Sequence, residues 1–107
     1  MSVNLTTRIV TTTPYTILVA DDVIFVNVTS GPASIILPAN GNNGGNDDNG
    51  TKRSFYIKDY SGTSQTNPIT ITASGGKLIN GVSFAMLNGR YSHIQVIYDG
   101  TNWMTIA

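Results

Sequence analysis

Alternating apolar and polar side chains recur along the chain, and the alternation is clearest close to the C-terminus. Between residues 92 and 98 the apolar side chains of Ile94, Val96 and Tyr98 fall on every second position, which is the period of a β-strand. Asp99-Gly100 then predicts a turn. A second short strand at 103–106 follows, so the pattern predicts a terminal hairpin with Trp103, the single tryptophan, in the core.

Short apolar segments separated by Gly, Pro, Asn and Asp precede this hairpin. The predicted strands span residues 15–19, 23–28, 33–37, 53–58, 69–73, 77–79 and 84–87. The segment 23–28 is apolar at neighbouring positions, which predicts a strand covered on both faces. The turns on either side of it predict two hairpin-like connections. Turns at intervals of about 8–12 residues indicate an all-β fold, an antiparallel β-sandwich or barrel of about eight short strands.

Two polar segments flank or interrupt this pattern. Residues 1–13 predict an N-terminal arm, and residues 14–107 predict a single β domain. The apolar anchors of the arm, which we expect to bind a partner, are Val3, Leu5, Ile9 and Val10. Residues 39–51 (ANGNNGGNDDNGT) contain no side chain apolar enough to pack, so they predict an exposed loop.

The alternation also predicts which side chains form the core. The expected core residues are Phe25, Val26, Ile35, Leu37, Phe55, Ile57, Ile69, Ile71, Ile94, Val96 and Trp103.

Charge is scarce in this chain and its composition excludes several classes of function. Charged residues make up 11% of the 107 residues, the six Lys and Arg balance six Asp, and Cys is absent. Zero net charge with one adjacent basic pair, Lys52-Arg53, argues against a nucleic-acid surface. Without Cys there are no disulfides or thiolate sites. The N-terminus lacks the features of a signal peptide and no apolar run is long enough for a membrane span, so we expect a soluble protein made in the cytoplasm.

The residues that most often carry chemistry offer little support for an enzyme. His93 is the single histidine, and its neighbours Ser92 and Ile94 are not acidic, whereas a catalytic triad needs an oriented carboxylate. All six aspartates lie at predicted turns, where Asp is common for backbone reasons. The Asp-rich segment 46–50 does not fit the spacing of an EF-hand loop. We therefore expect no catalytic residue and no cofactor, and at 46–50 we expect a solvated loop rather than the alternative, a Ca²⁺ site formed by its oxygen ligands.

Aromatic side chains are the remaining candidates for binding. Trp103 and Tyr56 lie within predicted strands, where packing is the simpler interpretation. Tyr60 and Tyr91 flank predicted loops, so they are the candidate ligand-facing aromatics.

Several segments in order resemble a β-rich module of tailed-bacteriophage virion proteins, above all tail fibres and spikes. The matching segments are PYT at 14–16, DD at 21–22, GPASIILP at 31–38, FYIKD at 55–59, NPITI at 67–71, ING at 79–81 and YDGTNW at 98–103. They cover about residues 12–106. The 39–51 loop is longer and richer in Asn and Gly than the tight connection usual in that module.

The resemblance implies a non-enzymatic structural protein of the virion that assembles as a homotrimer. Because no shaft or coiled coil accompanies the module, we expect a capsid decoration (cement) protein that attaches to the major capsid protein or another virion protein. The alternative is a tail-fibre or tail-tip adhesion module that binds a host receptor or surface carbohydrate. A flat apolar underside would favour the first function, and paired exposed aromatics beside a groove would favour the second. No nucleic acid or membrane partner is expected.

Overall fold

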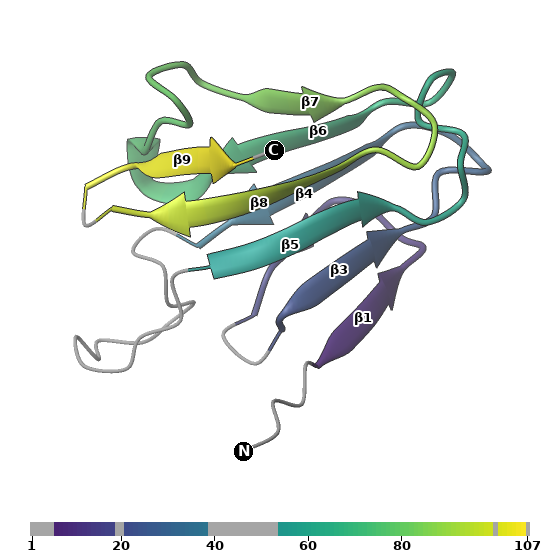
Figure 1. Ribbon diagram of the computed structural model, residues 1–107, viewed down its shortest axis with the longest axis horizontal. Helices are drawn as coiled ribbons and strands as arrows, with labels where there is room; N and C mark the ends of the chain where they lie inside the picture. The colour runs from purple at the N-terminus through teal and green to yellow at the C-terminus, as the bar shows by residue number, and fades with distance from the viewer. Residues whose placement is uncertain (1–5, 19–20, 39–53, 100, 107) are drawn as a thin grey trace.

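The computed structural model describes residues 6–18, 21–38, 54–99 and 101–106, which form two facing β-sheets (Figure 1). The five-stranded sheet has the order β1-β3-β5-β8-β9 and the four-stranded sheet has the order β2-β4-β6-β7. The strands of the first sheet are β1 (Thr7–Val10), β3 (Val23–Val26), β5 (Ser54–Asp59), β8 (His93–Tyr98) and β9 (Trp103–Ile106). Those of the second are β2 (Tyr15–Thr16), β4 (Ala33–Leu37), β6 (Ile69–Ala73) and β7 (Ala85–Leu87).

The chain crosses from one sheet to the other after each of its first five strands. As a result β1, β3 and β5 lie parallel in one sheet, and β2, β4 and β6 lie parallel in the other. This part of the molecule is a flattened coil in which each further strand is added beside the one two positions earlier. A parallel neighbour requires such a crossover, because a tight hairpin reverses the strand direction.

The coil ends where the chain turns back on itself after β6. A short 3₁₀ turn (Ser74–Gly76) follows β6, and β7 then pairs antiparallel with β6. Strand β8 returns to the first sheet antiparallel to β5, and β9 completes the predicted terminal hairpin with β8. The two sheets are therefore mixed rather than uniform.

The predicted all-β class and the terminal hairpin are confirmed, whereas a wholly antiparallel sandwich is wrong for this chain. Four of the described strand pairs are parallel and three are antiparallel. The predicted hairpins around residues 23–28 are also wrong, since β2, β3 and β4 alternate between sheets. Alternation indicates which side chains face the core, but it is the same for parallel and antiparallel strands.

The core lies between the two sheets and matches most of the predicted residues. Trp103, Phe55 and the apolar residues of β4 and β6 at alternate positions are buried. Phe25 is an exception: Ile24 and Val26 point inward, so Phe25 is half-buried on the outside of β3. Strand β3 is thus fully buried on one face only, contrary to prediction. Ile94 is partly buried and packs against the core.

The predicted boundary between an arm and a domain at residues 13 and 14 does not coincide with the sheet. Residues 7–10 form β1, which pairs with β3, and Val10 is buried in the core of its own domain. Ile9, at the neighbouring position, is 54% exposed. The short strand therefore carries one inward and one outward apolar side chain, and it lies at the edge of the five-stranded sheet. Val3, Leu5 and the 39–51 loop lie outside the described residues.

Candidate functional site

The side of the five-stranded sheet that points away from the core carries several exposed or half-buried apolar side chains. We call it the outer face. Residues that are cross-strand partners point to the same side of a sheet, so the strand register defines its members. They are Thr7, Ile9, Val23, Phe25, Ser54, Tyr56, Lys58, His93, Gln95, Ile97, Met104 and Ile106.

Most of these outward side chains are apolar, although the folded chain leaves them accessible. Ile9 and Ile106 on the two edge strands and Tyr56 in the centre are all exposed. Phe25 is partly covered by Tyr60, whose ring lies 5.6 Å from it and extends the apolar surface beyond the end of β5. Single exposed apolar residues are ordinary, but a continuous patch of them marks an interaction surface.

A shallow depression of about 270 Å³ lies near the middle of the outer face, lined by Val23, Tyr56, Lys58 and His93. Lys58 and His93 are register partners on β5 and β8. The ammonium Nζ of Lys58 donates a hydrogen bond of 2.6 Å to the backbone oxygen of Tyr91 and lies 5.7 Å from the centre of the Tyr91 ring. The positive charge is therefore directed to the end of the sheet.

The outer side of the four-stranded sheet has a different chemistry. Its register rows contain Ser34, Thr70 and Met86 in one row, and Thr16, Ile36 and Thr72 in the next. Hydroxyl groups dominate these rows, whereas the outer face of the five-stranded sheet is rich in aliphatic and aromatic side chains. The two sides of the molecule are thus suited to different neighbours: one to water and the other to an apolar surface.

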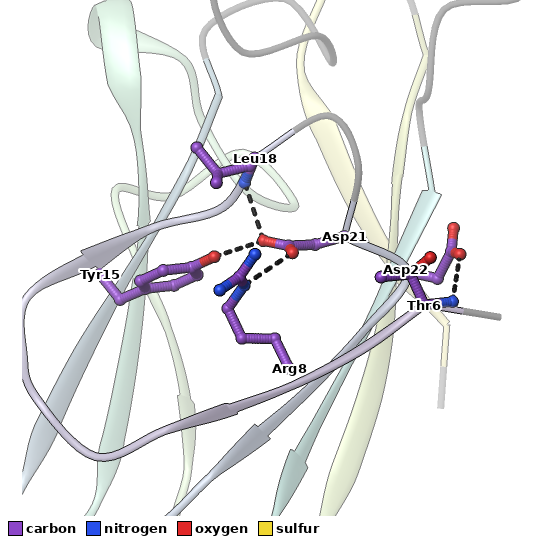
Figure 2. Close-up of polar contacts among 6 residues, drawn as sticks. All are labelled: Thr6, Arg8, Tyr15, Leu18, Asp21 and Asp22. Carbon is purple, nitrogen blue, oxygen red and sulfur yellow. Dashed lines mark hydrogen bonds and ion pairs between the residues drawn. The ribbon is translucent and has the colours of Figure 1, made fainter.

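Two buried aspartates brace the ends of the sheets, and the first is Asp21. Its carboxylate accepts hydrogen bonds from Arg8 Nε at 2.8 Å, from the Tyr15 hydroxyl and from the backbone N–H of Leu18 at 3.0 Å. Figure 2 shows Asp21 between these three groups, with Arg8 from β1 and Tyr15 from β2. This Asp21 corner therefore ties one strand of each sheet to the segment that leads into β3.

The pKa values at the Asp21 corner follow from this environment. Burial alone would raise the pKa of Asp21, but the hydrogen bonds from Tyr15, Arg8 and the Leu18 backbone outweigh it and lower the pKa. Burial, together with the hydrogen bond to Asp21, raises the pKa of Tyr15 to about 12. At neutral pH the corner holds an ionised Asp21 and a neutral Tyr15, which suits a brace rather than a proton-transfer site.

The second buried aspartate, Asp59, is the last residue of β5, and it joins two loops. Its Oδ1 accepts hydrogen bonds from the Gly62 N–H at 2.9 Å and Ser61 Oγ at 3.3 Å, and its Oδ2 accepts from the N–H groups of Ser64 and Tyr91 at 3.0 Å each. Burial alone would raise the pKa of Asp59, but the hydrogen bonds from Ser64, Tyr91 and Gly62 outweigh it and lower the pKa. These loops, which we call the Asp59 corner, therefore keep the carboxylate of Asp59 ionised and fixed in position.

Tyr60 and Tyr91, the candidate ligand-facing aromatics, are both about half exposed. They lie near the same end of the sheet but contact different groups. Tyr60 packs against Phe25, whereas the ring of Tyr91 covers Gly62 and faces Lys58. A ligand-binding role for either tyrosine stays a prediction.

The other candidates for chemistry have structural surroundings. His93 is exposed on the outer face with Lys58 as its register partner on β5. Asp99 accepts hydrogen bonds from the N–H groups of Thr101 and Asn102, which lower its pKa and close the β8–β9 turn. Within the described part of the chain, no three His, Cys, Asp or Glu side chains gather as a metal site would require. The Asp-rich segment 46–50 lies outside that part.

No described helix is long and apolar enough to span a bilayer. Neither the models of known protein families nor the curated proteins contain a match to this chain.

Proposed function

We propose that this chain is a non-enzymatic structural protein of a phage virion, a homotrimeric decoration (cement) protein that attaches to the major capsid protein. The resemblance of several segments, in their order along the chain, to modules of phage virion proteins suggests a role in the virion. The observation that supports assembly into a homotrimer is the outer face, a largely apolar sheet surface left accessible in the single chain. A surface of this kind is stabilised when another protein covers it.

The buried acidic groups support a structural rather than a catalytic role. A general acid needs a pKa raised towards neutrality, and a general base needs access to substrate. Asp21 and Asp59 have lowered pKa values, and both carboxylates are buried and accept several hydrogen bonds from their own chain. Their chemistry is used to fix the corners of the fold.

The experiment compares virus particles assembled with and without the chain. If the proposal is right, cryo-electron microscopy of the complete particle places trimers of the chain on the shell, and particles without it release DNA at a lower temperature. Density for the chain at the tail tip alone would contradict a decoration role. Light scattering of the isolated protein gives its subunit number independently of the particle.

The alternative function is an adhesion module for a host receptor or carbohydrate, and a second hollow favours it. A cavity of about 180 Å³ lies between the β1–β2 and β3–β4 connections, and its wall combines the polar residues Thr11, Thr12, Thr13, Asn27 and Ser30 with the apolar residues Val10, Pro32 and Ala33. Hydroxyl and amide groups of this kind suit a polyhydroxylated ligand. Saturation-transfer NMR with host-surface glycans tests this function, and no transfer of saturation from the protein to any of these glycans would exclude them as ligands.

A further inference from the structure

We propose that the outer face of the five-stranded sheet is the surface through which copies of this chain pack against one another. This inference rests on the proposed homotrimer and names the part of the molecule that would hold it together. The occupant of the outer face is therefore a second copy of the chain rather than a capsid protein, a glycan or a membrane.

The apolar side chains follow a diagonal path across the sheet, because the rows of register partners also contain Lys58, His93 and Gln95. Ile9 and Phe25 are partners at the β1 side, and Ile97 and Met104 are partners at the β9 side. Tyr56 on the central strand is exposed between them. In a homotrimer each copy would share this surface between two neighbours around the threefold axis.

Charge favours a second copy as the occupant. Among the described outward residues of this sheet, Lys58 carries the one full charge, and its ammonium already bonds the Tyr91 carbonyl at the end of the sheet. Apart from Lys58, the described outward residues offer no full charge for an oppositely charged partner to select. Two copies can therefore approach with little like-charge repulsion, in a chain whose net charge is zero.

The size of the surface indicates the strength of the contact. Five strands of this length present a footprint of roughly 400 Å², since strands lie about 4.8 Å apart and rise about 3.3 Å per residue. Protruding side chains raise the accessible area above that footprint. A standard interface buries about 800 Å² on each partner, so the outer face supports a contact at the lower end of the range. Association should therefore depend on protein concentration.

The test compares two methionines with similar exposure, one on each sheet. Met104 on the outer face is 45% exposed, and Met86 on the outside of the four-stranded sheet is 43% exposed. Both belong to strands at a sheet edge. We expect Met104→Glu to weaken self-association of the full chain by about tenfold or more, because the contact would bury an unpaired charge. Met86→Glu should leave association unchanged. Sedimentation velocity over a range of concentrations measures both, and thermal melting checks that each variant is folded.

A second pair of variants locates the contact without adding charge. The chain contains no Cys, so a single introduced thiol reports on its own surroundings. Gln95→Cys lies on the outer face and Thr72→Cys on the hydroxyl-rich side, and both parent residues are half-buried in the single chain. The thiol at position 95 should react about tenfold more slowly when the protein concentration is well above the dissociation constant. The thiol at position 72 should react equally fast at all concentrations.

The outcomes separate this inference from the proposed function. A trimer that Met104→Glu dissociates and Met86→Glu does not supports both. A dimer with the same response supports the outer face as the contact but contradicts the homotrimer. A trimer that neither Met104→Glu nor Tyr56→Ser weakens, with no protection at position 95, overturns this inference and leaves the homotrimer standing. A chain that is monomeric at every concentration overturns the contact and the homotrimer together.

Discussion

The carboxylate of Asp59 accepts a hydrogen bond of 3.0 Å from the backbone N–H of Tyr91, a residue 32 positions further along the chain. Tyr91 has a positive φ of 57°, a conformation that is uncommon for a residue with a side chain. Its ring covers Gly62, whose N–H donates to the same carboxylate. One buried anion therefore fixes the turn before β8 against the loop after β5, and it places Tyr91 where its carbonyl accepts a hydrogen bond from Lys58.

The Asp59 corner gives the first prediction. In Asp59→Asn, one of the two carboxylate oxygens becomes an NH₂ group, which then faces N–H donors whichever way the amide is turned. We expect a loss of about 1–3 kcal/mol in the free energy of unfolding, because buried donors lose their acceptor. Asp99→Asn is the matched control, since the oxygen Oδ1 alone accepts from Thr101 and Asn102 and an amide retains it. Urea unfolding measures both variants, and equal stability of the two would show that Asp59 is not a brace.

Acid should destabilise the protein through its buried aspartates. The pKa values of Asp21 and Asp59 in the folded chain lie below the ordinary value of 3.8. The folded state therefore binds fewer protons than the unfolded state, so stability is present above pH 3.8 and is lost as the pH falls through the lowered values. We expect little change in unfolding free energy between about pH 5 and 7 and a decline below about pH 4. Asp59→Asn should flatten the decline, and a parallel pH profile for the variant would argue against this cause.

Trp103 gives a prediction about the core. Its indole packs against Phe55 and Tyr98, with ring centres 5.9 and 5.2 Å away, and is fully buried. Trp103→Ala should cost about 3–5 kcal/mol through lost contacts and a cavity. Trp103→Phe should cost less, because it keeps an aromatic ring and removes a buried indole N–H that has no acceptor among the described residues. Chemical denaturation followed by circular dichroism measures both, and a phenylalanine variant as unstable as the alanine variant would contradict this account.

The sequence predicts the strands of this fold better than it predicts their partners. Alternation placed Ile35, Ile57 and Val96 correctly in the core, because a period of two separates the faces of any strand. The crossing of the chain between sheets has no such local signal. The turn before β4 leads to the second sheet, although its Gly and Pro are equally suited to a hairpin.

The candidate surface was harder to predict than the core. Residues 23–26 are all apolar, so periodicity alone could not separate the inward Ile24 from the outward Phe25. The outer face also combines residues from five strands, and its continuity depends on their register. A signal was present in the alternate positions of the terminal hairpin, where Ile97, Met104 and Ile106 are apolar on the side opposite Trp103.

The last prediction concerns the N-terminal segment. Two deletions of different length distinguish a free arm from a strand that belongs to the domain. Deleting residues 1–5 leaves β1 intact, so we expect an unchanged melting temperature. Deleting residues 1–10 removes the buried Val10, worth about 1.5–3 kcal/mol of apolar burial, and takes the Arg8 guanidinium away from the buried Asp21 carboxylate. It also uncovers the edge of β3. We expect this longer deletion to lower the melting temperature clearly or to prevent folding.

The two deletions also test whether residues 1–5 bind outside their own domain, as the anchors Val3 and Leu5 predict. Retention on purified particles is then measured for the shorter deletion, whose fold is expected to remain intact. Loss of retention without loss of stability would support a docking role for these residues. Full retention would assign attachment to the folded domain, and destabilisation by the shorter deletion would show that residues 1–5 support the domain itself.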